Sequence, residues 1–243
     1  MKGFSTVCKR ELKGYFSTPV AYVFLCIFLV LAVGLPWTLG RYFEMRTADL
    51  RVFFRYLPWI LAILAPATAM RLWSEERRSG SIELLMTLPI STSAAVLGKF
   101  IAAWLFLGIA LAGTLPMPLT VAYLGDPDWG PIVTGYMGGF LLAGAFLAVG
   151  SFFSVLTKNQ VISFILSVVV CGLMVVLDWP SVQDTLASIY LPLARLVESL
   201  SFLAHYESMQ RGVLQIRDVL FFLLVIAGWV FAGGIMLEER KAA

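Results

Sequence analysis

The chain has 243 residues, of which 60% are hydrophobic and 14% charged, and its formal net charge at pH 7 is +3. The charges collect in short islands between long apolar runs, which is the composition of an integral membrane protein. The small net charge argues against nucleic-acid binding, three scattered cysteines argue against a disulfide framework, and a single histidine argues against a metal site.

Apolar runs predict an all-α membrane protein with six transmembrane helices, because about 20 apolar residues cross a hydrocarbon core of about 30 Å. The first run follows a basic N-terminus without the short apolar core and cleavage site of a signal peptide, so we expect it to be a retained span. Pro66 lies in the second run, and Pro116 and Pro118 should kink or end the third helix. The expected spans cover residues 20–40, 57–73, 94–122, 131–156, 160–179 and 217–237.

An even number of spans places both termini on one side of the membrane. That side would hold eleven of the eighteen lysines and arginines, including every lysine. By the positive-inside tendency, the side with the termini is cytoplasmic.

Residues 1–14 alternate apolar positions such as Phe4 and Val7 with basic positions such as Lys9 and Lys13. This pattern predicts an amphipathic helix that lies on the cytoplasmic membrane surface. The alternative is a disordered basic tail that only fixes the topology.

Residues 180–216 form a long outer connection that contains a helical pattern. Pro192 would suit the first turn of that helix. The helix would either cap a pathway from outside or pack at the membrane interface, and both interpretations stay open. Its apolar face has helical spacing and consists of Leu193, Leu196, Val197, Leu200 and Leu203.

Small residues recur at four-residue spacing in the fourth and sixth spans. They are Gly135, Gly139 and Ala143 in the fourth, and Gly228 and Ala232 in the sixth. Such stripes let helices approach closely, either within one subunit or between two subunits. With no internal repeat, residues 1–243 are expected to form a single transmembrane domain.

The connection after the second span carries four consecutive charges at residues 75–78. Because an Arg, Lys or Asp at the bilayer centre costs about 2.5–3.5 kcal/mol, the second span must end before them. We expect Ser74 to cap a short charged helix and Gly80 to break it. A second short helix over Ser81–Thr87 should end before Pro89, and "STS" at 91–93 should begin the third span.

Leu84, Leu85 and Leu88 would project from this second short helix. An apolar surface presented to the cytosol suits a partner that binds a helix in a groove. The alternative is a flank of the second span whose leucines dip back into the lipid headgroups.

Two segments resemble one family of transport proteins. "SEERRSGSIELLMTLPISTSAAVLGKF", residues 74–100, resembles the cytoplasmic connection after the second span in permeases of the type-2 ABC exporter family. "HYESMQRGVLQIRDVLFFL", residues 205–223, is similar to the lead-in to the last span in the subgroup of permeases for gliding motility and nitrous-oxide-reductase maturation. With the six-span layout, the resemblance covers essentially the whole chain.

The resemblance implies a bacterial inner-membrane permease that works as a dimer and engages ATP-hydrolysing ABC subunits, which bind ATP and magnesium. It also implies an N-terminal surface helix, a coupling helix after the second span, and short outer helices before the sixth. The implied coupling residues are Glu75, Glu76, Arg77, Arg78, Gly80, Glu83, Leu84, Leu85, Leu88 and Pro89. The implied outer gate region includes Leu193, Leu196, Leu200, His205, Glu207 and Gly212.

The sequence itself contains no phosphate-binding loop, since Gly98-Lys99 is followed by Phe100 and lacks the preceding glycine. Ser151 and His205 are expected at opposite ends of the spans, which argues against an intramembrane serine protease. We therefore expect no catalytic, cofactor-binding or metal-binding residue in this chain. The alternatives to an exporter permease are a secondary transporter and a mechanotransmitting protein that moves no solute.

Overall fold

The computed structural model describes residues 2–40, 49–80, 91–177, 179–192, 197 and 199–242. In these residues the regular secondary structure is helical, as the predicted all-α class requires. The helices are α1 (Lys2–Ser17), α2 (Pro19–Thr38), α3 (Arg51–Ala69), α4 (Arg71–Ser79), α6 (Thr92–Ala112), α7 (Pro116–Leu124), α8 (Trp129–Leu156), α9 (Gln160–Val176), α10 (Pro180–Ile189), α12 (Phe202–Gln210) and α13 (Ile216–Ala242).

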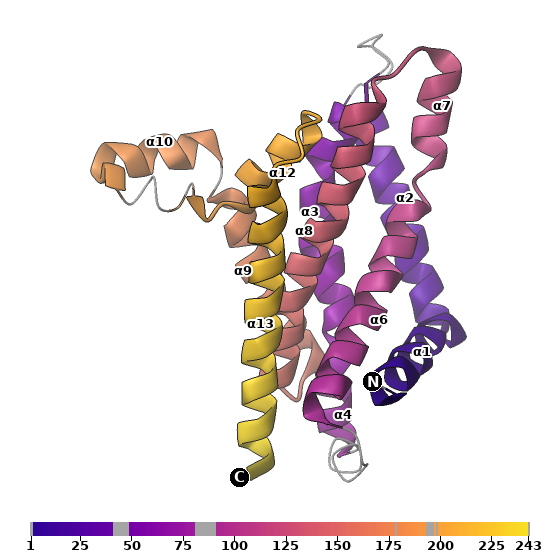
Figure 1. Cartoon of the computed structure of the whole chain (residues 1–243), viewed down its shortest axis with the longest axis vertical. Helices are drawn as coiled ribbons and strands as arrows, with labels where there is room; N and C mark the ends of the chain where they lie inside the picture. Colours follow the sequence, from indigo (N-terminus) through magenta and orange to yellow (C-terminus); the bar gives the residue numbers. More distant parts are fainter. Residues whose placement is uncertain are drawn as a thin grey trace.

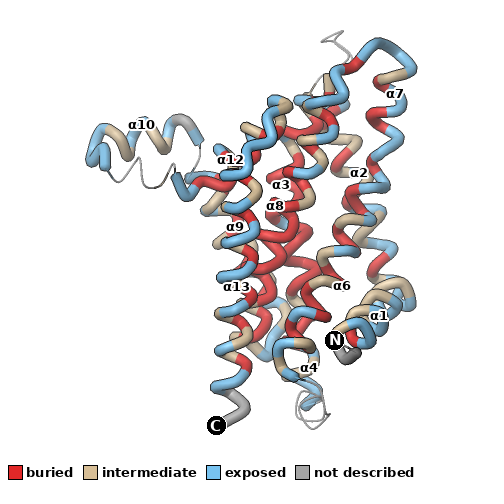
Figure 2. Tube along the Cα trace, viewed as in Figure 1, coloured by how far each residue is buried: buried red, intermediate tan, exposed pale blue. Residues whose placement is uncertain are grey.

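Helix α8 occupies the centre of an elongated bundle, where it packs against α3, α6, α9, α12 and α13 (Figure 1). Figure 2 shows that the buried residues concentrate on α3 and α8. In the most apolar stretch of α8 78% of the residues are buried, against 22% in α2 and in α13. The apolar outer faces of α2 and α13 are therefore the surfaces that lipid would contact.

Glycines on α8 explain how α3 comes so close. An added Cβ at Gly135 would lie 2.7 Å from the Phe54 ring, and one at Gly139 would lie 2.7 Å from Leu57. The small-residue stripe of the fourth span thus serves packing within the chain. On α13, an added Cβ at Gly228 would meet nothing within 4 Å.

Within the described residues, five helical segments are each long and apolar enough to cross a membrane, whereas six were expected. Helix α9 has only 17 residues, and it reaches the required length only together with α10, which is bent from it by 76°. The sixth span depends on that bent pair. The five segments are Pro19–Thr38, Arg51–Ser79, Thr92–Leu124, Trp129–Leu156 and Ile216–Glu239.

The ends of α3 and α6 lie near two predicted boundaries, the start of the second span and the break in the third. The second span was expected to begin near residue 57, and its helix, α3, begins earlier, at Arg51, with Arg51 and Arg55 exposed at its end. Long basic side chains at a helix end can reach out of the apolar zone. The expected break at Pro116 is confirmed, since α6 ends at Ala112 and α7 begins at Pro116.

Both chain ends lie at the same end of the bundle, together with α1 and α4, while α7, α10 and α12 lie at the opposite end (Figure 1). Helix α1 extends to Ser17, beyond the predicted residue 14, and packs along α6. Val7 is buried against Gly98, and the Tyr15 ring stacks on Phe106 with centroids 4.8 Å apart. Residues 2–17 are therefore a packed helix, which excludes the disordered-tail alternative.

The connection before the last span contains α10 and α12. A single helix running from Pro192 through Leu203 is wrong, because Leu200 and Ser201 lie outside any helix and the Ser201 hydroxyl caps α12 by accepting the Ala204 N–H at 2.9 Å. A serine cap begins a new helix where the side-chain oxygen replaces the missing backbone acceptor. Leu193 and Leu196 lie outside the described residues.

Candidate functional site

Helix α4 carries the charged run, and a serine from α8 holds its first turn. The chain passes from α3 to α4 at Met70, where the continuous ladder of helix hydrogen bonds is disturbed. The buried Ser154 hydroxyl accepts the N–H groups of Trp73 at 3.0 Å and Ser74 at 3.1 Å, and it donates to the Met70 carbonyl at 3.0 Å. One side chain therefore satisfies three buried backbone groups at this junction.

The predicted N-cap at Ser74 is wrong. Helix α4 begins at Arg71, so Ser74 lies inside it, and its hydroxyl donates to the Met70 carbonyl. A serine inside a helix can donate its hydroxyl to the carbonyl four residues earlier. Here the Ser74 N–H donates to Ser154 instead, so the hydroxyl takes its place at the Met70 carbonyl.

Lys99 on α6 is the centre of the charged cluster. Its side chain is only 4% exposed, and its ammonium group lies 2.7 Å from a Glu76 carboxylate oxygen and 3.7 Å from a Glu11 carboxylate oxygen. It also donates to the Leu72 carbonyl at 3.2 Å and lies 5.2 Å from the centre of the Trp73 ring. A buried lysine needs such partners to stay charged, and here they come from α1 and α4.

The far end of α4 is joined to α8 as well. The Arg77 guanidinium donates to the carbonyl of Val155, close to the end of α8. Gly80 then ends α4 with φ of 72°, a left-handed conformation that glycine adopts without steric cost. The expected break at Gly80 is confirmed.

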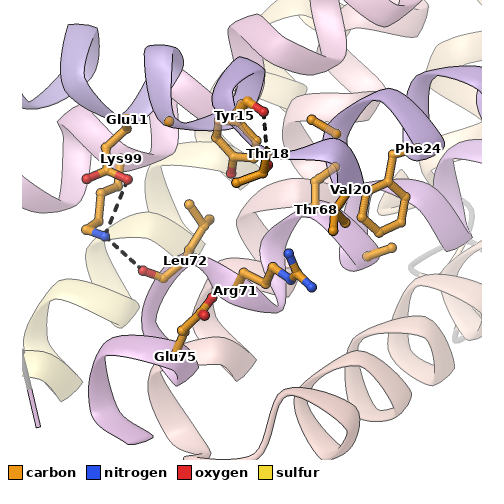
Figure 3. A pocket seen from close by; sticks show the side chains of 13 residues that line it. Glu11, Tyr15, Thr18, Val20, Phe24, Thr68, Arg71, Leu72, Glu75 and Lys99 are labelled. Atoms are coloured by element: carbon orange, nitrogen blue, oxygen red, sulfur yellow. Dashed lines mark hydrogen bonds and ion pairs between the residues drawn. The ribbon is translucent and has the colours of Figure 1, made fainter. Parts of the chain in front are cut away.

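A cavity of about 170 Å³ lies beside this cluster, between α1, α2, α3, α4 and α6. Figure 3 shows Glu11, Arg71, Glu75 and Lys99 around its polar part, with Phe24 on its apolar side. Burial raises the pKa of the Tyr15 phenol in its wall, nearby Glu11 raises it further, and Arg71 acts in the opposite direction.

The sequence of this helical bundle matches a known family of membrane proteins. A sequence model described as an ABC-2 family transporter protein matches residues 38–238. The chain belongs to the ABC-2 transporter family. It is accordingly a multi-pass membrane permease of an ABC transporter, and the family implies an ABC ATPase subunit as its partner.

No curated protein matches the sequence. The similarity to the gliding-motility and nitrous-oxide-reductase-maturation subgroup therefore stays a prediction.

The predicted coupling residues of this ABC-2 permease fall into two groups. Glu76 and Arg77 bind neighbouring helices, whereas Glu75, Arg78 and Gly80 are exposed. Outside the described residues lie Glu83, Leu84, Leu85, Leu88 and Pro89.

Sequence reasoning did not assign Glu11, Lys99 or Ser154 to this site. For Lys99 a signal was available, because it is the only charged residue of its apolar run and buried charges are retained only with partners. A serine such as Ser154 gives no comparable signal, since its role depends entirely on which helix lies opposite.

At the opposite end of the permease, His205 of α12 and Asp218 of α13 form a buried pair, with Nδ1 and Oδ1 2.7 Å apart. His205 also stacks on Phe221 at 4.1 Å between ring centroids. The second Asp218 oxygen, Oδ2, is buried without a hydrogen-bond partner among the described residues, and it borders a cavity of about 360 Å³. Sequence reasoning named His205 but missed Asp218.

The other described residues of the predicted gate region are more exposed. Leu200 is exposed, and Glu207 forms an exposed ion pair of 3.4 Å with Arg211. Gly212 has φ of 85° and packs beside Pro131. Among the described residues, no group of three His, Cys, Asp or Glu side chains could hold a metal ion.

Proposed function

We propose that this permease exports a substrate by using ATP hydrolysed on its partner subunit, and that residues 74–91 couple the two proteins. The observation that supports this role is the attachment of α4. Lys99 ties it to α6 and α1, while Ser154 and the Arg77–Val155 hydrogen bond tie it to α8. A force on α4 would therefore act directly on two spans and on the N-terminal helix.

The docking surface in this proposal is the apolar stretch that follows α4. Leu84, Leu85 and Leu88 would seat in a groove of the ATPase, and Glu83 and Pro89 would frame them. The charged residues of α4 would remain at the membrane surface, where their cost in hydrocarbon is avoided. On this proposal the end of the bundle that holds the termini is cytoplasmic, and the membrane is a bacterial inner membrane.

Transport would then follow from movement of two permease subunits, identical or different. ATP and magnesium bound by the partner ATPases would close the ATPase dimer and push the two coupling elements together. The spans would transmit this movement to an outward opening near residues 193–212. The chemical identity of the cargo does not enter this mechanism.

The position of the buried charges supports ATP coupling over coupling to an ion gradient. A secondary transporter normally places ionisable groups near the membrane midplane. In the described residues, the buried ionisable side chains apart from cysteine and tyrosine are Lys99, His205 and Asp218, and they lie toward the two ends of the bundle.

The test is copurification of the permease complex from native cells in mild detergent, comparing the natural chain with Leu85→Asp. We expect a Walker-type ATPase with the natural chain and at least about tenfold less with Leu85→Asp, because a charge would be desolvated in the groove. Leu124→Asp is the matched control, since Leu124 is exposed at the opposite end of the bundle.

An ATPase recovered equally with both variants would remove the docking role of Leu85. Recovery of no ATPase under conditions that preserve membrane complexes would overturn the proposal and favour a secondary transporter, for which ion-dependent transport without an ATPase is the expected result.

A further inference from the structure

The cavity beside the charged cluster contains Arg71, which forms no ion pair with any described residue. Arg71 Nε is buried and makes no hydrogen bond to any described residue. In Figure 3, dashed lines join Lys99 to its partners, whereas the Arg71 guanidinium carries none. The Arg71 side chain is half-buried, and a buried donor atom without an acceptor is costly, so a group from outside the described residues is expected beside Nε.

The nearby carboxylates do not fill this need. Glu11 lies against Lys99, and Lys99 is also bound to Glu76. Glu75 borders the same cavity, but no ion pair within 4.0 Å joins it to Arg71. Among the described residues, Arg71 therefore lacks an anionic partner, although the two carboxylates of Glu11 and Glu75 line the cavity.

The charged side chains that line the cavity balance, and Glu76, which also pairs with Lys99, lies outside the lining. Glu11 and Glu75 contribute two negative charges, and Arg71 and Lys99 contribute two positive ones. A ligand with a large net charge would disturb this balance. A ligand that carries one negative and one positive group would preserve it and would offer an anion to Arg71.

The remaining wall of the cavity is mostly apolar, with Tyr15, Thr18 and Thr68 as its polar members. Its apolar part is formed by Val20, Ala21 and Phe24 of α2, with Ala67 of α3 and Leu72 of α4. The cavity lies at the junction between α1 and the start of the span α2. With α1 on the membrane surface, as its sequence predicts, this junction would be at the level where lipid headgroups meet acyl chains. The ligand should thus be amphiphilic as well as zwitterionic.

We propose that this cavity binds the headgroup of a zwitterionic phospholipid with a primary amine, such as phosphatidylethanolamine. The Arg71 guanidinium binds the phosphate through charge-assisted hydrogen bonds, for which its planar donors are suited. The ammonium group is oriented toward Glu75, and the glycerol and first acyl carbons lie against Phe24. Because Arg71 is the first residue of α4, a bound lipid fixes the start of α4 at the membrane surface.

The experiment is native mass spectrometry of the delipidated permease, with any subunit that copurifies, titrated without nucleotide. The probes are phosphatidylethanolamine, phosphatidylglycerol and inorganic phosphate. We expect phosphatidylethanolamine to bind the natural chain about 10- to 100-fold more tightly than Arg71→Gln, as loss of a hydrogen bond to a charged group predicts. Arg55→Gln is the matched control, since Arg55 is an exposed arginine on α3 at the other end of the bundle.

Glu75→Gln should reduce the preference for phosphatidylethanolamine over phosphatidylglycerol, because it removes the carboxylate that faces the ammonium group. If Arg71→Gln does not fold, Arg71→Lys is the substitute variant. A lysine keeps the single positive charge but lacks the paired planar donors of the guanidinium, so weaker lipid binding is again expected.

Equal binding of phosphatidylethanolamine by the natural chain and both Arg71 variants would overturn the site. Displacement of the lipid by millimolar inorganic phosphate would identify free phosphate as the ligand and overturn the lipid assignment. No ATPase activity is measured, so this inference can fail while the exporter proposal stands, and the reverse also holds.

Discussion

The Lys99 ammonium group on α6 lies 2.7 Å from a Glu76 carboxylate oxygen on α4. The two side chains differ in environment, since Lys99 is 4% exposed and Glu76 is 20% exposed. Lys99 consequently has little access to water and depends on Glu76, Glu11 and the Leu72 carbonyl for its solvation. This contact attaches α4 to α6, in addition to the hydrogen bonds that attach α4 to Ser154 and Val155 of α8.

Lys99→Met should destabilise the permease, because it leaves Glu76 partly buried without a counter-charge. Loss of one partner of a buried pair costs about 3–5 kcal/mol, and the residual exposure of Glu76 favours the lower value. At about 2–4 °C per kcal/mol, the midpoint of thermal unfolding in detergent should fall by about 6 °C or more.

Lys158→Met is the control for this change. Lys158 is an exposed lysine in the short connection between α8 and α9, so its replacement should leave the unfolding midpoint nearly unchanged. Equal midpoints for the two variants would show that the Lys99 cluster contributes nothing to stability.

Ser154→Ala should loosen the start of α4. Without the hydroxyl, the N–H groups of Trp73 and Ser74 lose their acceptor in a buried position, at a cost of about 1–3 kcal/mol for each unsatisfied group. Amide hydrogen exchange of residues 70–79, measured by mass spectrometry, should become faster.

Ser151→Ala gives the matched comparison on the same helix. The Ser151 hydroxyl donates to the Ala148 carbonyl within α8, so exchange in α4 should remain as in the natural chain. If Ser154→Ala behaves like Ser151→Ala, the α3–α4 junction is held by other contacts.

At the opposite end, His205→Ala should weaken the attachment of α12 to α13, whereas Glu207→Ala on the same helix should have little effect. The first change breaks a buried pair and leaves the Asp218 carboxyl group without its His205 partner, at a cost of about 1–3 kcal/mol. The second breaks an exposed pair worth less than about 1 kcal/mol.

In His205→Ala, hydrogen exchange in α12 should be faster and the unfolding midpoint lower than in Glu207→Ala. Recovery of the ATPase should be unchanged in both variants. A double-mutant cycle with Asp218→Asn tests the pairing itself. An interaction energy near zero between positions 205 and 218 would contradict it.

Much of the fold could be predicted from local patterns. Apolar runs of the right length located the spans, the prolines at 116 and 118 separated α6 from α7, and Gly80 marked the end of α4. These signals are local because span length, proline sterics and glycine conformation act within a few residues. The same local reasoning misplaced the cap at Ser74, since the real partner of that turn is Ser154, far away in the chain.

Composition and the length of the apolar runs are enough to identify a helical membrane protein with a charged connection between two spans, because the cost of charge in hydrocarbon does not depend on how the helices pack. The packing of the helices adds that Lys99 contacts Glu76 and Glu11, that Ser154 binds the start of α4, and that Arg71 borders a cavity without an ion pair among the described residues. Ion pairs and hydrogen bonds act over a few ångströms, so their partners are chosen by how helices pack against one another.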